Sequence, residues 1–267
     1  MTTESLSYRV QRRLSYSVTA ALDRLFGEYI DGHYPEWRTE TALRYFPIAK
    51  DLEGQAISEL KMLDVGSGAS GIKPYLQVEP QLLVGLDSDF SKDSDRFLIR
   101  DLVISQGERL PFADHAFEIV ICLDVLEHVQ LENRIALIKE VLRVASKTVY
   151  IGFPTGKGAR RQDVRLDRAF VARYGARHYF LVEHLSHALP SKRDLEAALL
   201  QSSITPKQIK RYSNQNLLMR EWLMLWAFVS NSHFTSYFGR RLSLLFFPLL
   251  SRINLGRCYR QIFKIEL

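Results

Sequence analysis

The chain has 267 residues, of which 46% are hydrophobic and 25% are charged, so it can bury a substantial core and has no composition typical of disorder. Its two cysteines, Cys122 and Cys258, cannot build a disulfide framework, and neither belongs to a metal-binding motif. The start of the chain has no apolar run typical of a signal peptide, and no stretch is long and apolar enough to span a bilayer. We therefore expect a cytoplasmic protein.

Positive charge is concentrated late in the sequence. The net charge is +6, and no Asp or Glu occurs between Trp222 and Ile265. Two interpretations stay open, a helical elaboration with a solvated basic rim or a surface for an anionic partner. The basic residues of this stretch are Arg240, Arg241, Arg252, Arg257, Arg260 and Lys264.

The first part of the chain predicts helices, and the part that follows predicts alternating strands and helices. Residues 18–30 place apolar side chains at helical spacing, and residues 42–48 add further helical turns. The alternation beyond them predicts a parallel sheet with helices on both faces. Strands are expected at 61–65, 82–86, 96–100, 117–123 and 147–153, and a helix is expected at 131–144.

Beyond Pro154 the sequence is basic and rich in turn-forming residues as far as 161, and helices resume after it. Ser191 is a plausible N-cap, with Asp194 in the first turn that follows it. Pro248 is expected to break the last helical run. The expected helices are 162–175, 191–201, 216–229 and 238–253, and the expected last two strands are 207–212 and 258–265.

These elements predict a helical segment at 1–57 and a single α/β domain at 58–267. A helical insert at 214–254 is expected to precede the last strand of that domain.

The most informative segment is the glycine-rich run that follows the first predicted strand. It contains the pattern G-x-G-x-x-G, which lets the backbone turn sharply and come close to a ligand. Asp64 precedes the first glycine by two residues, which disfavours a pyrophosphate and favours a cationic group. Asp87 ends the next strand, where a carboxylate can accept both hydroxyls of a ribose. The pattern indicates a nucleoside that carries a positively charged amino-acid tail.

Residues 61–153 resemble the class I S-adenosylmethionine-dependent methyltransferases of the type 11 kind. KMLDVGSGASG is similar to their first motif, VGLDSD to their ribose-binding strand end, and GERLPFADHAFEIVICLDVLEHV to the stretch that ends in LEH. The resemblance implies a Rossmann-like, seven-stranded and mostly parallel sheet whose last strand is antiparallel. It also implies S-adenosyl-L-methionine as cofactor and a transferase activity.

By position, the resemblance assigns a set of residues to the cofactor. Gln106 stands where many relatives have an Asp that contacts the adenine amine, and its amide oxygen can also accept that hydrogen bond. Asp101 is the alternative for this contact. The assigned residues are Asp64, Gly66, Ser67, Gly68, Asp87, Ser88, Gln106, Gly107 and Asp124.

Three residues are candidates for the chemistry at the acceptor, namely Asp124, His128 and His184. Asp124 and His128 follow the fourth strand and so open onto the same edge of the sheet as the glycine turn. His184 belongs to a run with His178, Glu183 and His187 that could transfer protons. His184 and His187 could also share a helix face as a metal pair, but no metal-binding motif is present and we expect no metal.

The expected function is methyl transfer to a small-molecule acceptor or to a glycan- or lipid-linked acceptor. The alternatives are an RNA or protein methyltransferase and a non-catalytic scaffold that binds the cofactor, and a dehydrogenase with the same glycine pattern is a minor one. The basic and strongly apolar insert at 214–254 suits a lipid surface or a second subunit better than nucleic acid. A peripheral membrane contact or a homodimer is therefore an open possibility.

Overall fold

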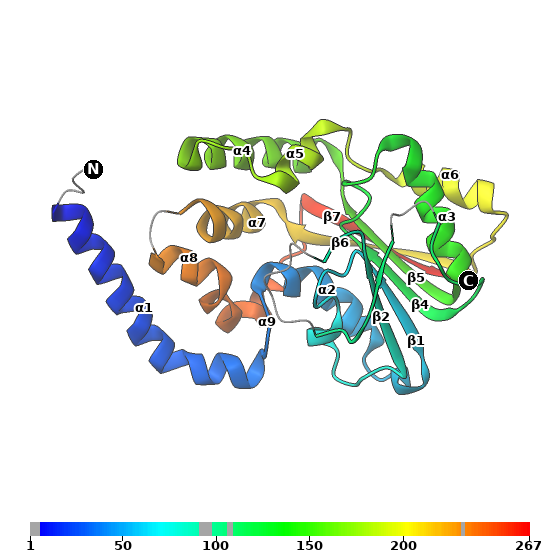
Figure 1. Cartoon of the computed structure of the whole chain (residues 1–267), viewed down its shortest axis with the longest axis horizontal. Helices are drawn as coiled ribbons and strands as arrows, with labels where there is room; N and C mark the ends of the chain where they lie inside the picture. Colours follow the sequence, from blue (N-terminus) through cyan, green and yellow to red (C-terminus); the bar gives the residue numbers. More distant parts are fainter. Residues whose placement is uncertain (1–5, 91–97, 106–108, 231–232) are drawn as a thin grey trace.

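The computed structural model describes residues 6–90, 98–105, 109–230 and 233–267. Seven strands form one sheet in the order β3-β2-β1-β4-β5-β7-β6, and only β7 runs antiparallel to its neighbours (Figure 1). This confirms the expected Rossmann-like sheet with an antiparallel last strand. The strands are β1 Lys61–Val65, β2 Leu82–Asp87, β3 Asp101–Ile104, β4 Phe117–Leu123, β5 Ala145–Pro154, β6 Gln208–Asn216 and β7 Cys258–Glu266.

The order of the strands decides where a ligand can bind. The chain passes from β1 outward to β2 and β3, and then returns to the other side of β1 with β4 and β5. The connections after β1 and β4 therefore leave in opposite directions. A crevice opens beyond the carboxyl ends of two such strands, which is the usual ligand position in an open α/β sheet.

Helices cover both faces of the sheet, as expected from the sequence. On one face α2 and the insert pack against Met62, Ile121 and Ile262, and on the other face α3 and α6 pack against Val120 and Ile151. Two separate apolar clusters result. The helices are α1 Leu6–His33, α2 Thr39–Leu52, α3 Arg134–Val144, α4 Gly156–Tyr174, α5 Tyr179–Ser186, α6 Lys192–Ser202, α7 Leu217–Met224, α8 His233–Arg240 and α9 Phe247–Leu250.

The insert and the N-terminal helices lie side by side. α1 contacts α8 and the short helical turn Leu242–Phe246, and it projects beyond the end of the sheet domain (Figure 1). Thr39 at the start of α2 shares a buried hydrogen bond of 2.6 Å with Ser243. Among the described residues, no helix combines the length and the apolar composition that crossing a membrane requires.

Several local predictions need correction. A strand was expected at 96–100, but the third strand begins at Asp101. The described residues of the expected range, 98–100, are not part of a strand, and 96–97 lie outside the described residues. α4 already begins at Gly156, because that glycine adopts a positive φ and starts the helix directly after β5. Pro248 does not break the last helical run. It lies in the first turn of α9, where its missing N–H costs nothing, and the break comes near Arg241 instead.

Candidate functional site

The turn after β1 depends on glycine at two positions. Gly66 and Gly71 adopt φ values of +73° and +49°, which strain any other residue. A Cβ atom at Gly66 would overlap the side chain of Val125, and one at Gly71 would overlap a carboxylate oxygen of Asp64. The turn can therefore come close both to the loop after β4 and to its own supporting carboxylate.

Asp64 supports the glycine turn from behind. Its carboxylate is buried and accepts hydrogen bonds from the backbone N–H of Ile72 at 2.8 Å and from the hydroxyl of Tyr45 at 3.3 Å. Burial raises the pKa of Asp64 to about 7. Asp64 is not among the residues that line the cleft, so this arrangement gives it a positioning role and no direct contact with a ligand in the cleft.

Asp87 lies at the carboxyl end of β2 and lines the cleft. One carboxylate oxygen accepts the N–H of Gly68 at 3.0 Å, and the other accepts the N–H of Ser88 at 2.7 Å. The oxygen that binds Gly68 keeps a lone pair for a ligand hydroxyl, which fits a ribose. The other oxygen also accepts longer bonds from the hydroxyl of Ser88 at 3.4 Å and the N–H of Asp89 at 3.5 Å, which a second hydroxyl would have to displace. The hydrogen bond to Gly68 also ties the turn to the strand that carries Asp87.

The remaining predicted cofactor residues divide into three groups. Ser67, Gly68 and Ser88 line the same cleft as Asp87. Gln106 and Gly107 lie outside the described residues. Asp101 pairs with Val84 at the start of β3, which puts it at the edge of the sheet opposite the cleft and removes it as an adenine contact.

Asp124 lies directly after β4 and is bound by two arginines. Arg260 binds both of its carboxylate oxygens, and Nε of Arg44 lies 3.2 Å from one of them. Burial would raise the pKa of Asp124, but the two guanidinium groups hold it below its usual range. Asp124 lines the cleft as a fixed anion, which suits a contact role better than the acceptance of a proton.

Arg260 is buried within β7 and has no exposed surface. It also donates hydrogen bonds to the side chains of Asn214 at 2.6 Å and Gln215 at 3.1 Å. The last strand therefore supplies the counter-charge for a residue at the end of β4.

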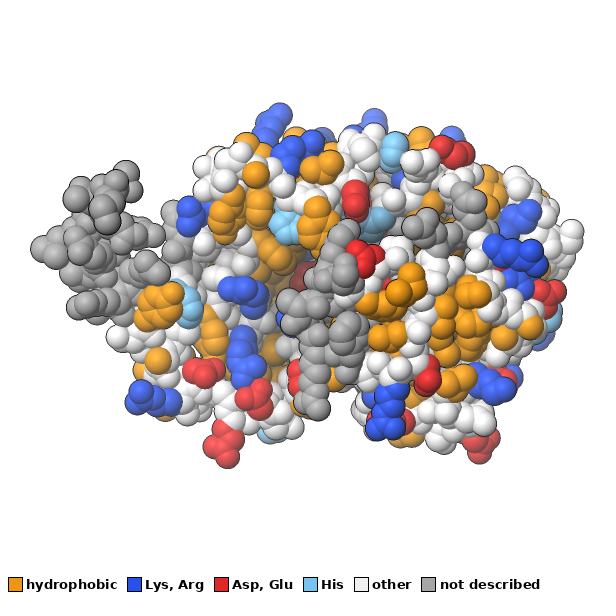
Figure 2. All heavy atoms as spheres, in the orientation of Figure 1, with side chains coloured by type: hydrophobic (Ala, Val, Ile, Leu, Met, Phe, Trp, Pro, Cys, Tyr) orange, Lys and Arg blue, Asp and Glu red, His pale blue; other side chains and the backbone are white. Residues whose placement is uncertain are grey.

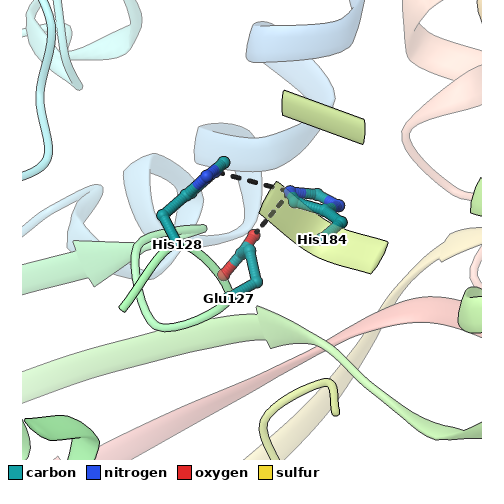
Figure 3. Close-up of side chains that lie close together, drawn as sticks. All are labelled: Glu127, His128 and His184. Atoms are coloured by element: carbon teal, nitrogen blue, oxygen red, sulfur yellow. Dashed lines mark hydrogen bonds and ion pairs between the residues drawn. The ribbon is translucent and has the colours of Figure 1, made fainter. Parts of the chain in front are cut away.

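His128 and His184 face one another although 55 residues separate them (Figure 3). Their Nε2 atoms are 3.4 Å apart. Nδ1 of His128 lies 2.5 Å from Glu183, and Nδ1 of His184 lies 3.2 Å from Asp163. Glu127, from the same loop as His128, lies beside both rings.

His128 can accept a proton in the cleft. Desolvation and the neighbouring His184 lower the pKa of His128 below its ordinary value, so the imidazole is neutral near pH 7. The side chain of His128 lines the cleft, whereas His184 is buried behind it and does not line it. His184, which could have shared a helix face with His187, pairs with His128 instead.

The cleft joins the glycine turn to the two histidines in one hollow of about 640 Å³. Its walls come from the turn after β1, the ends of β2 and β4, the start of α2, and α5. Figure 2 shows this face of the molecule, with histidine and acidic side chains gathered near its centre. A site of this size lies within the range of roughly 300–1,000 Å³ that is typical of small-molecule sites.

The sequence did not identify the residues from distant elements that support Asp64, Asp124 and His184. Arg44 and Tyr45 belong to a helix that was expected only as a helical segment, and Asp163 and Tyr259 were not singled out. Arg260 was counted only as part of the basic block. A signal was available for it, because Arg260 alternates with Ile262 on one face of the predicted strand, and a charged side chain buried in a strand is rarely without a partner.

Residues 63–152 match the family model described as a methyltransferase domain. These residues carry a methyltransferase domain. No curated protein matches the chain. Among solved structures, the plantazolicin methyltransferase BamL, in complex with a triazolic desmethylPZN analogue and SAH, has a TM-score of 0.52 at 13% identity, with 97% of this chain and 98% of that one covered.

Two further solved structures are similar to this methyltransferase. A methyltransferase from Mesorhizobium loti has a TM-score of 0.47 at 11% identity, covering 86% of this chain and all of that one. The magnesium protoporphyrin IX methyltransferase from Synechocystis has a TM-score of 0.46 at 15% identity, covering 85% and 83%.

The methyltransferase uses S-adenosyl-L-methionine, and the cleft fits this cofactor. The glycines line the wall of the cleft without side chains, and a carboxylate oxygen of Asp87 can accept a hydroxyl of the ribose. The bound cofactor supplies an activated methyl group. The protein has to align the acceptor with that group and, where the acceptor is protonated, remove its proton.

Proposed function

We propose that this methyltransferase acts on a small-molecule acceptor, or on the terminal group of a glycan- or lipid-linked acceptor. The observation that carries the proposal is the single cleft that runs from the glycine turn to His128, Glu183 and Tyr179. Cofactor and acceptor have to share this space, so only a small acceptor, or the reactive end of a larger one, fits beside the cofactor.

We assign the two ends of the cleft different tasks. Gly66, Ser67, Gly68, Asp87 and Ser88 hold the cofactor at one end, where they line the hollow. His128 is the proton acceptor at the other end, with Glu183 fixing its ring through the bond to Nδ1. Asp124 contacts the bound groups between the two ends, and His184 acts on His128 from behind.

The basic residues of the C-terminal block do not support a nucleic-acid substrate. Arg260 is buried against Asp124, Arg241 donates to Asp31 at 2.8 Å, and Nζ of Lys264 lies 2.8 Å from Asp51. Half of the six charges are thus neutralised within the chain. A nucleic-acid surface needs cations that remain available to phosphates.

The insert at 214–254 is proposed as the contact with a lipid surface that carries a lipid-linked acceptor. Leu218 and Trp222 on α7 are exposed by 73% and 60%. Next to them, Arg161 and Arg257 line a second hollow with Leu218. Exposed apolar side chains beside arginines match the boundary between acyl chains and phosphates. Pairing of two copies through the same surface is the alternative.

The proposed function is tested by following a labelled methyl group. The protein is incubated with S-adenosylmethionine labelled in the methyl group and with cell extract that is fractionated afterwards into small molecules, lipids, RNA and protein. Label in the small-molecule or lipid fraction is expected. Label confined to RNA or protein would contradict the proposed acceptor class.

The Asp87→Ala variant serves as the control for the cofactor site. Loss of two charge-assisted hydrogen bonds to the ribose, each worth about 1.5–3 kcal/mol, should weaken the affinity for S-adenosylhomocysteine by about 100-fold or more in calorimetry. Asp101→Ala removes the same charge at the opposite edge of the sheet and should change the affinity less than about twofold. Equal affinities of the two variants for S-adenosylhomocysteine would contradict the assignment of Asp87 to the ribose.

A further inference from the structure

We propose that Glu127, His128 and His184 bind a divalent transition-metal ion of the Zn²⁺ type (Figure 3). The inference goes beyond the proposed function and does not depend on which acceptor is methylated. Because the ion would take the Nε2 lone pair of His128, it would replace the proton-accepting role proposed above for that residue. It rests on the spacing of the three side chains, on what fixes the two imidazole rings, and on the surroundings of Glu127.

The spacing of the two imidazole nitrogens matches one small ion, and the carboxylate of Glu127 would have to move closer to complete the site. The Nε2 atoms of His128 and His184 are 3.4 Å apart, and a carboxylate oxygen of Glu127 lies 3.8 Å from Nε2 of His184. All three ligand atoms lie within 4.8 Å of one another. Two ligands at a tetrahedral angle on an ion with bonds of about 2.0–2.1 Å are themselves about 3.3–3.4 Å apart. The two histidines already have this separation.

The other nitrogen of each ring is held by a carboxylate. Glu183 binds Nδ1 of His128 at 2.5 Å, and Asp163 binds Nδ1 of His184 at 3.2 Å. Asp163 also accepts a hydrogen bond of 2.9 Å from the hydroxyl of Tyr259, so it acts as an acceptor towards both neighbours. Each imidazole therefore carries its hydrogen on Nδ1 and presents a lone pair on Nε2. A carboxylate behind the ring is typical of metal-binding histidines.

Two lone pairs that face each other at 3.4 Å repel unless a positive charge lies between them. That charge is either a shared proton or a metal ion, and the surroundings of Glu127 favour the ion. Glu127 is 1% exposed, and within the described residues neither of its carboxylate oxygens has a hydrogen bond. A buried carboxylate without a hydrogen bond is costly, and a metal ion between Glu127 and His184 would supply a counter-charge.

The ligand set indicates the kind of ion. Two imidazole nitrogens and one carboxylate oxygen are the ligands of zinc sites that keep a fourth position open. His128 lines the cleft while Glu127 and His184 are buried, so the open position faces the acceptor end of the cleft. Where the proposed transfer is to an oxygen atom, a metal ion there would bind that oxygen and favour loss of its proton.

The test measures metal binding without any acceptor. The tag-free full-length protein is freed of metal with a chelator and titrated with Zn²⁺ by calorimetry, and Co²⁺ is added separately to record its visible absorption. We expect one Zn²⁺ per chain and a Co²⁺ spectrum of tetrahedral intensity. Absence of stoichiometric Zn²⁺ binding by the unaltered protein overturns the proposal and leaves a shared proton between the two rings.

Variants locate the ion. Glu127→Gln keeps the volume of the side chain and removes the anionic ligand, and His184→Ala removes a nitrogen ligand; each should weaken Zn²⁺ binding by about 100-fold or more. His187→Ala is the matched control, because it alters a histidine three residues from His184 that is outside the cluster, and it should bind as the unaltered protein does. Unchanged Zn²⁺ affinity in Glu127→Gln or His184→Ala would place any ion elsewhere and contradict the proposal. Affinity for S-adenosylhomocysteine reports that each variant is folded.

Discussion

The two ends of the cleft are built in different ways. At the glycine turn the decisive hydrogen bonds join residues close in sequence, 8 positions apart for Asp64 and Ile72 and 19 for Gly68 and Asp87. At the acceptor end the contacts are long-range, with 136 positions between Asp124 and Arg260. One end is a local motif, and the other is an assembly of distant elements.

This difference teaches which part of the site depends on the rest of the fold. The glycine turn needs β1, β2 and the loop between them, and α2 supports it through the hydrogen bond from Tyr45 to Asp64. The acceptor end needs β4, α2, α4, α5 and β7 to be in place together. We therefore expect perturbations of the distant elements to reach the acceptor end first and to leave cofactor binding largely intact.

The largest effect is expected from Arg260→Met. The change leaves the partly buried Asp124 with Arg44 as a cationic neighbour, and removal of the buried member of such a pair costs up to about 3–5 kcal/mol. Urea denaturation should show this loss in the free energy of unfolding, while the affinity of the folded protein for S-adenosylhomocysteine changes by less than about threefold. A loss of cofactor affinity alongside the loss of stability would contradict the expectation that the glycine turn does not depend on the acceptor end.

The double variant Asp124→Asn/Arg260→Met is the control for this prediction. It removes the charge of Asp124 as well as that of Arg260, so no carboxylate is left without its arginine. The double variant should therefore recover at least about 1 kcal/mol of the stability that Arg260→Met loses. No recovery would mean that Arg260 stabilises β7 through Asn214 and Gln215 rather than through Asp124.

A smaller effect, confined to the glycine turn, is expected from the titration of Asp64. Its pKa is about 7 in the folded protein and has an ordinary value of 3.8. The folded state therefore retains a proton that the unfolded state loses, so the free energy of unfolding falls as the pH rises from about 4 to 7. At 1.36 kcal/mol per pH unit, the fall between pH 5 and pH 7 is about 2–3 kcal/mol.

Asp64→Asn removes this titration and still offers a carbonyl oxygen to the N–H of Ile72. The pH dependence of the free energy of unfolding should become flatter in this variant than in the unaltered protein, as measured by denaturation at pH 5, 6 and 7. Curves of equal slope would show that Asp64 is already ionised at pH 5.

The smallest effect on stability is expected outside the cleft, from Trp222→Ser. This side chain is 60% exposed, so the free energy of unfolding should change by no more than about 0.5 kcal/mol. Flotation with anionic vesicles should nevertheless fall, because the change removes apolar surface from the proposed lipid contact. Leu200→Ser, at a side chain 85% exposed on α6, is the matched control and should leave flotation unchanged.

The sequence predicted the strands around the glycine turn because their signals are local. Residues 61–65 and 117–123 were expected as strands and are β1 and β4 with the same bounds. The Ser191 cap is also confirmed, since its side chain and that of Asp194 form a reciprocal capping box. Each of these features is decided by fewer than about ten consecutive residues.

The acceptor end could not be predicted in the same way, because its partners lie on elements whose placement only the whole fold decides. The pattern of α7 shows the difficulty. The apolar residues of this helix are spaced so that Arg220 falls outside their stripe. Arg220 is nevertheless buried, with its guanidinium 3.4 Å from the centre of the Tyr259 ring and a hydrogen bond to Gln162. A cation stacked on an aromatic ring can thus be buried at a position that hydrophobic periodicity assigns to the solvent-facing side.

The position of β7 between β5 and β6 has a consequence for the order in which the protein can fold during its synthesis. β6 leaves the ribosome before β7, but its hydrogen-bonding partner in the sheet is β7. Until about 50 further residues have been made, β6 has no strand to pair with and Asp124 has no Arg260. At this stage the nascent chain contains the complete glycine turn, but its sheet still has an open edge. That edge is a target for chaperones and for unwanted strand pairing. Synthesis of β7 closes that edge and introduces the buried arginine in a single step.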